Sequence, residues 1–167
     1  MSKKFLVLTT CLWLSACALP PRTVTELKST IEENPSLGGI EHFEIHSGGV
    51  AEVSARLREF AERCLSVEAI ASHCGLNGCS GRKYMTFTPK FEKHSGGLRF
   101  ALFVLHRDGI KLREETKDGS YVMVAEVDSK GGKLKGHVWA PKYGYGDLLG
   151  TTKGWMTGTQ KACPDLI

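Results

Sequence analysis

The sequence lacks the short motifs that identify several large classes of enzyme. It contains no G-x-S-x-G nucleophile elbow, no phosphate-binding G-x-x-x-x-G-K-[ST] loop and no H-E-x-x-H zinc motif. The adjacent residues Glu114 and Glu115 do not provide a catalytic carboxylate pair either, because neighbouring strand residues point to opposite faces and cannot easily form a dyad. We therefore expect a protein that is not an enzyme, with no catalytic residues and no cofactor.

The sequence also lacks a strong excess of one charge and an apolar run long enough to cross a membrane. It has 22 lysines and arginines against 18 aspartates and glutamates, with both signs interspersed. Nucleic-acid-binding domains instead concentrate basic residues on one face, so no nucleic-acid partner is expected. A membrane-spanning helix needs about 20 apolar residues, and no run is that long. The 167 residues, 41% hydrophobic, have the composition of one ordinary globular domain.

The longest apolar run lies at the N-terminus. Residues 5–16 follow two lysines, which is the pattern of a secretory signal peptide. The run ends in L-S-A-C at residues 14–17, which resembles the lipobox of bacterial lipoproteins. The resemblance implies that signal peptidase II cleaves before Cys17 and that Cys17 then carries a diacylglyceryl group and an acyl chain such as palmitate. Because Ala18, and not aspartate, follows the cysteine, the resemblance also implies sorting to the outer membrane.

These features divide the chain into three parts. Residues 1–16 are the expected signal peptide, residues 17–39 the lipidated N-terminus and a tether containing Pro20-Pro21 and Asn34-Pro35, and residues 40–167 a single periplasmic α+β domain. Each buried methylene contributes ~0.8 kcal/mol, so two or three acyl chains anchor a protein stably. We expect the chain to reside in the bacterial cell envelope, with its lipid anchor in the outer membrane and its domain in the periplasm.

Four cysteines remain once the signal peptide is removed and Cys17 is lipidated: Cys64, Cys74, Cys79 and Cys163. An even number of cysteines in an exported chain predicts two disulfides, with three possible connectivities. Cys74 and Cys79 flank an Asn-Gly turn, which favours a bond between them and leaves Cys64 to pair with Cys163. The alternative is a metal site formed by His73, Cys74, Cys79 and one more ligand. Their spacing is at the edge of the zinc-ligand range and no second ligand pair lies near, so no metal is expected.

The hydrophobic periodicity predicts an α+β fold. Apolar residues at three- and four-residue spacing from Val50 to Leu65 predict an amphipathic helix. A glycine at every fourth position from Gly146 to Gly158 is compatible with a packed helix over residues 146–161 or with a loop-rich ending. Strand-like runs occupy residues 41–46, 82–94, 98–106, 120–127 and 133–139. The run 98–106 is apolar on both faces, which predicts a central strand.

The order β-α-β-β-β-β-α resembles the helix-grip or TATA-binding-protein-like arrangement. The resemblance implies a curved antiparallel sheet of about five strands with two helices on one face. It rests on the order of elements and does not choose a function.

A pattern F-E-x-H-S-G-G occurs twice, from Phe43 and from Phe91. Gathered together, its glutamates and histidines could form a metal or acid/base site. The expected fold places the two strands far apart, so we interpret both copies as strand ends before glycine turns. Four residues along a strand also separate His42 from His46 by about 13 Å, too far to share a metal. A hydrolase using the adjacent pair His46-Ser47 or His94-Ser95 is disfavoured, because neighbouring residues rarely have the geometry of base and nucleophile.

The expected function is that of a lipoprotein with a non-catalytic interaction or assembly domain, with the membrane and an envelope protein as partners. The alternative is a carrier of a small apolar ligand or lipid in the groove between helix and sheet, and a periplasmic hydrolase is the third possibility. A cavity of ligand size lined by apolar side chains would favour the carrier, whereas a filled core with an exposed aromatic patch would favour the interaction domain. We expect the aromatic residues Trp139, Tyr143, Tyr145 and Trp155 to fill the core rather than to face a partner.

Overall fold

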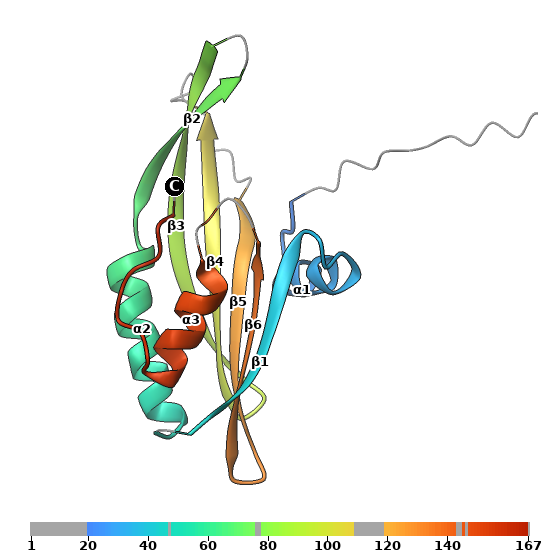
Figure 1. Ribbon diagram of the computed structural model, residues 1–167, viewed down its shortest axis with the longest axis vertical. Helices are drawn as coiled ribbons and strands as arrows, with labels where there is room; N and C mark the ends of the chain where they lie inside the picture. Colours follow the sequence, from blue (N-terminus) through green and yellow to red (C-terminus); the bar gives the residue numbers. More distant parts are fainter. Residues whose placement is uncertain are drawn as a thin grey trace, which may run out of the picture.

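The computed structural model describes residues 20–46, 48–75, 78–108, 119–142, 145 and 147–166, with the side chains of 71–83 and 107–108 not included. These residues form an α+β domain on one antiparallel sheet (Figure 1). The predicted signal peptide and Cys17 lie outside them. The elements in chain order are α1 (Val24–Glu33), β1 (Gly38–Ile45), α2 (Val50–Leu65), β2 (Glu68–Gly75), β3 (Gly78–His94), β4 (Gly97–Asp108), β5 (Gly119–Lys130), β6 (Lys133–Pro141) and α3 (Leu148–Thr157).

The sheet has the strand order β1-β6-β5-β4-β3-β2, so the first strand pairs with the last. This confirms the predicted α+β class and antiparallel sheet, but the sheet has six strands rather than about five. The additional strand is β2, which pairs with the 17-residue β3 from Glu68↔Thr86 to Gly75↔Gly78. β3 is long enough to pair with β2 on one side and with β4 on the other.

Helices α2 and α3 cover one face of the sheet and enclose the main core (Figure 1). The predicted apolar stripe of α2 is confirmed, because Val53, Leu57, Phe60, Cys64 and Leu65 are all buried. The predicted bond between Cys64 and Cys163 is also present, with a Cα–Cα distance of 5.2 Å. It joins the C-terminal tail to the buried side of α2.

The glycine-rich C-terminal segment is helical, as one of the two interpretations predicted. The Asp147 carboxylate accepts a hydrogen bond from the backbone N–H of Gly150 at 2.8 Å and begins α3, and Gly158 ends it with φ 77°. A Cβ on Gly154 would overlap the side chain of Gln160, so this glycine allows the tail to fold back closely over the helix. Leu148, Thr152 and Trp155 of this helix are buried, whereas Cys163 of the tail is exposed.

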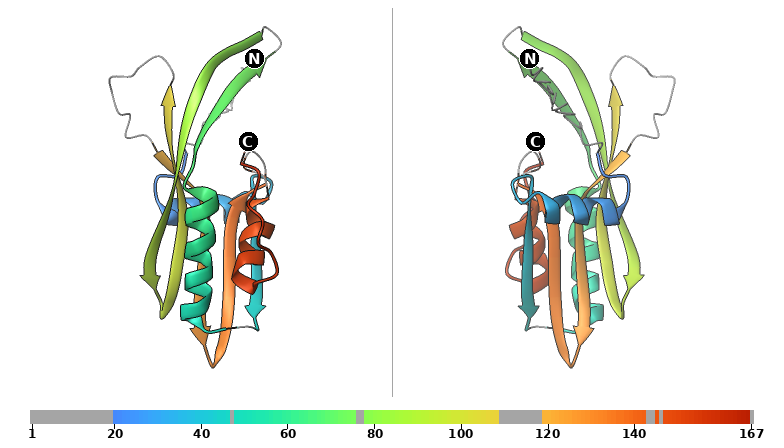
Figure 2. Two further views of the ribbon diagram at one scale, coloured as in Figure 1. Left: turned by 90° about the vertical axis from the view of Figure 1, so that its left-hand side faces the viewer. Right: turned by 90° about the vertical axis from the view of Figure 1, so that its right-hand side faces the viewer.

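Helix α1 lies across the opposite face of the sheet (Figure 2). Thr23 begins it in a capping box with Glu26, and its buried residues Leu27 and Ile31 pack on three sheet residues, Ala101, Val124 and Trp139. Residues 24–33 of the expected tether therefore form a helix that packs on the sheet. The physical reason is that the central strands are apolar on both faces, so the second face also needs a cover.

The aromatic residues near the C-terminus fill the core, as predicted. Trp155 is fully buried and stacks on Phe60, while Trp139 lies beneath α1. Tyr145 packs edge-on against Phe87. Tyr143 lies outside the described residues.

Candidate functional site

Five polar side chains form one line across the sheet on the α1 face. Direct strand pairing joins Glu92 of β3 to Arg99 of β4, Arg99 to Glu126 of β5, Glu126 to His137 of β6, and His137 to His42 of β1. Residues paired directly across strands project from the same face and touch. We call these five residues the cross-sheet row.

Glu126 is the buried centre of the row, with 4% of its surface exposed. One carboxylate oxygen accepts a hydrogen bond from Lys28 of α1 at 3.0 Å and the other from Arg99 at 2.7 Å. Burial alone would raise the pKa of Glu126, but these two cations lower it below its ordinary value. Because Lys28 belongs to α1, this network fixes the helix to the sheet.

A second set of contacts fixes α1 over Trp139. The indole N–H of Trp139 donates to Glu32 at 3.1 Å, and the ammonium of Lys28 lies 4.0 Å from the centre of the indole ring. A buried indole N–H needs an acceptor, and Glu32 provides one. The α1 helix is thus held by an apolar stripe and by two directional contacts.

Arg99 connects the row to the end of β3. Its guanidinium donates to Glu92 at 2.8 Å and lies 2.9 Å from Nδ1 of His94. Burial lowers the pKa of Arg99, but the hydrogen bonds to Glu92 and Glu126 outweigh this effect and raise it. Arg99 is therefore a permanent cation shared between two carboxylates.

The other end of the row is a pair of histidines. The Nδ1 atoms of His42 and His137 face each other at 2.5 Å, and the ring of His137 stacks on Trp139 with centroids 6.0 Å apart. Nε2 of His137 lies 4.0 Å from a carboxylate oxygen of Asp128. Burial, followed by the proximity of His42, lowers the pKa of His137. This lowered pKa favours the neutral form of the His137 imidazole at pH 7.

His94 and Ser95 do contact each other, against the expectation for adjacent residues. The Ser95 hydroxyl lies 3.3 Å from Nε2 of His94. However, a neutral imidazole has one acceptor nitrogen, and a guanidinium N–H of Arg99 lies within 3.1 Å of both ring nitrogens. Arg99 therefore competes for the lone pair that a general base would use to remove the serine proton.

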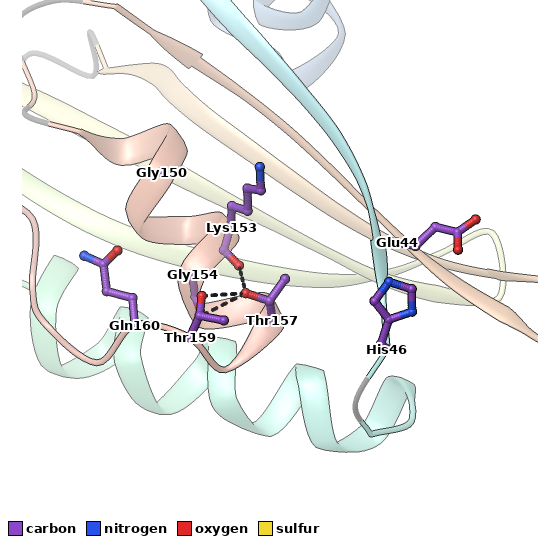
Figure 3. Close-up of a pocket in the computed structure, with 8 residues that line it drawn as sticks. All are labelled: Glu44, His46, Gly150, Lys153, Gly154, Thr157, Thr159 and Gln160. Carbon is purple, nitrogen blue, oxygen red and sulfur yellow. Dashed lines mark hydrogen bonds between the residues drawn. The ribbon is translucent and has the colours of Figure 1, made fainter.

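A pocket of about 660 Å³ lies between the end of β1 and helix α3 (Figure 3). It is lined by Glu44, His46, Gly150, Lys153, Gly154, Thr157, Thr159 and Gln160, and more of the exposed lining area is apolar than polar. The Thr157 hydroxyl bonds to the backbone of its own helix, and the ammonium of Lys153 pairs with Glu41 at 2.9 Å. Glu44 points away from α3 in Figure 3. These polar groups do not converge on one point.

The outer edge of β2 is a second surface feature. This strand ends the sheet, and in the described part of the chain no strand pairs with its outer side. Ile70 of β2 is 50% exposed, and Tyr84, its direct partner on β3, is 40% exposed. The β2–β3 ribbon extends beyond the helices (Figures 1 and 2).

The structure brings together some of the predicted site residues and separates others. Cys74 and Cys79 are direct partners across β2 and β3, but their side chains lie outside the described residues, so their bond stays a prediction. The two F-E-x-H-S-G-G copies lie on β1 and β3, with β6, β5 and β4 between them, as expected.

Sequence reasoning missed the cross-sheet row. His42 was compared only with His46 on its own strand, whereas its neighbour His137 is 95 residues away. The available signal was a glutamate, Glu126, in an otherwise apolar central strand, because a buried acid requires a cationic partner.

Within the described residues, no group of three or more histidine, cysteine, aspartate or glutamate side chains is placed to hold a metal ion. No helix in the described part of the chain is long and apolar enough to cross a membrane. Comparisons with protein-family models, curated proteins and solved structures find no match.

Proposed function

We propose that this chain is a lipid-anchored protein of the bacterial outer membrane whose periplasmic domain binds another envelope protein and catalyses no reaction. The anchor rests on the lipobox-like residues 14–17. The disulfide between Cys64 and Cys163 supports an oxidising compartment, because such bonds are rare in the cytosol. We also retain the likeness to helix-grip folds as part of the proposal, supported by α2 and α3 packing on one face.

The observation that carries the binding proposal is the open edge of β2. An unpaired edge presents backbone N–H and C=O groups that can pair with an added strand. Proteins usually protect such edges with lysine, proline or inward charges, yet the β2 sequence EAIASHCG has neither lysine nor proline and only one acidic residue, Glu68, at its start. The β1 edge, with sequence GGIEHFEI, has Glu41 and Glu44 within the strand. Exposed Ile70 and Tyr84 add apolar surface beside the β2 edge.

The two alternatives have less support. A carrier of apolar ligands needs a cavity enclosed by hydrophobic side chains, whereas the pocket beside α3 is lined by glycines and by hydroxyl, amide and ionisable residues, with no aliphatic side chain among them. A hydrolase needs an available base, and Arg99 competes for the acceptor nitrogen of His94. We therefore favour binding of an extended segment of a partner protein along β2.

Site-specific photo-crosslinking in cells tests this proposal. A photoreactive amino acid at Ile70 should give a discrete adduct with one envelope protein. Ile40 is the matched control, because it is an exposed isoleucine, 37% accessible, on the opposite edge strand. Adducts of equal yield from both positions, or none from Ile70, would contradict binding at the β2 edge.

A further inference from the structure

The histidine pair at the end of the cross-sheet row has two features of a metal site. His42 and His137 approach from two different strands, and the ring nitrogens that face each other are both Nδ1. His42 is exposed and the pair lies at the sheet surface, so an ion could reach it from solvent. Imidazole nitrogen is a preferred ligand for zinc, copper and nickel.

The surroundings of His137 resemble the outer shell of such sites. A metal-bound imidazole commonly directs its other nitrogen toward a carboxylate, which orients the ring. Here Nε2 of His137 lies 4.0 Å from one carboxylate oxygen of Asp128, somewhat beyond hydrogen-bond distance, and the second carboxylate oxygen is buried and has no hydrogen-bond partner among the described residues. Trp139 stacks on the same ring and limits its rotation.

Two carboxylates lie near the pair, and only Asp128 has an oxygen without a partner among the described residues. Glu126 adjoins His137 on β5, and its charge is shared with Lys28 and Arg99. Asp128 lies on the same strand with one oxygen unpaired.

We propose that His42 and His137 form a surface site for one divalent transition-metal ion, held by their two Nδ1 atoms and oriented through Asp128. Metal–nitrogen bonds of about 2.0–2.1 Å require the two nitrogens to be about 3 Å apart, which a small rotation of the exposed His42 ring provides. Two imidazoles are fewer than the ligands of a structural zinc site, so water completes the coordination. The site is therefore an exchangeable one rather than a structural centre.

Copper titration followed by electron paramagnetic resonance tests the proposal. The full chain, expressed with its own leader and a histidine-free C-terminal tag, is purified in detergent and titrated with Cu²⁺. The expected result is one ion per chain, with nitrogen hyperfine splitting from two imidazoles. His42→Gln and His137→Gln should each weaken binding by more than the about 10- to 100-fold that loss of an outer-shell carboxylate costs, and Asp128→Asn should fall within that range.

His46→Gln is the matched control, because His46 follows the same strand and lies away from the pair. It should bind Cu²⁺ as the wild type does. If circular dichroism shows that His137→Gln does not fold, His42→Gln decides the test, because His42 is exposed and its replacement should leave the fold intact. Unchanged binding in His42→Gln, loss of binding in His46→Gln, or no saturable binding by the wild type would each overturn the proposal.

Discussion

Removing the bond between Cys64 and Cys163 should cost a large share of the domain's stability. The bond closes a loop spanning a sequence separation of 99 residues. In the chain-entropy model a loop of about 100 residues corresponds to about 4.7 kcal/mol, and losses of native disulfides usually measure 2–5 kcal/mol. Since domains are stable by about 5–15 kcal/mol, the double variant Cys64→Ala/Cys163→Ala should lose roughly a third or more of its unfolding free energy.

Urea unfolding followed by tryptophan fluorescence measures this loss. The matched control is Cys74→Ala/Cys79→Ala, which removes the predicted short-loop bond and should cost only about 2 kcal/mol in the same model. A reductant should then destabilise the control variant by nearly as much as the Cys64→Ala/Cys163→Ala change destabilises the wild type. If the unfolding free energy of Cys64→Ala/Cys163→Ala lies within about 1 kcal/mol of the wild-type value, the bond between Cys64 and Cys163 is not what stabilises this domain.

Three further predictions concern the network and the C-terminal helix. Glu126→Gln should lower the unfolding free energy by roughly 2–3 kcal/mol, because it leaves two partly buried cations without their carboxylate. Glu92→Gln, at the exposed end of the row, should change the unfolding free energy by less than about 1 kcal/mol. Urea unfolding measures both losses, and equal losses would refute this ranking. Stability should fall as the pH drops below about 6.5, because the lowered pKa of His137 means that the unfolded chain binds more protons there than the folded chain does. In His137→Gln, the melting temperature should therefore fall less steeply between about pH 6.5 and pH 5 than in the wild type. Gly154→Ala should destabilise by about 1–3 kcal/mol despite alanine's higher helix propensity, because its methyl group would overlap Gln160; a raised melting temperature would contradict that packing.

Periodicity within single segments was sufficient to predict much of the fold. The stripe on α2 and the two apolar faces of β4 are local patterns, and both appear in the structure as expected. The bond from Cys64 to Cys163 followed from pairing the other two cysteines across a short turn. Strand β2 and the packing of α1 were missed because neither segment shows by itself what surface it will meet.

The cross-sheet row could not be predicted from the sequence, for a geometric reason. Its members are aligned by the register of four strand pairs, and a shift of one residue in any pair would move a side chain to the other face. His42 and His137 become neighbours only after β1 pairs with the last strand. No spacing within the sequence encodes that contact.

The most direct test of the account is the mass of the N-terminal peptide of the mature chain, isolated from outer membranes. The proposed compartment, the oxidised cysteines and the envelope partner all depend on the anchor. We predict a peptide that begins at Cys17 and carries a diacylglyceryl group and an acyl chain, and that disappears in Cys17→Ser together with signal cleavage. A mature chain that begins elsewhere, or one with an unmodified Cys17, would contradict the account.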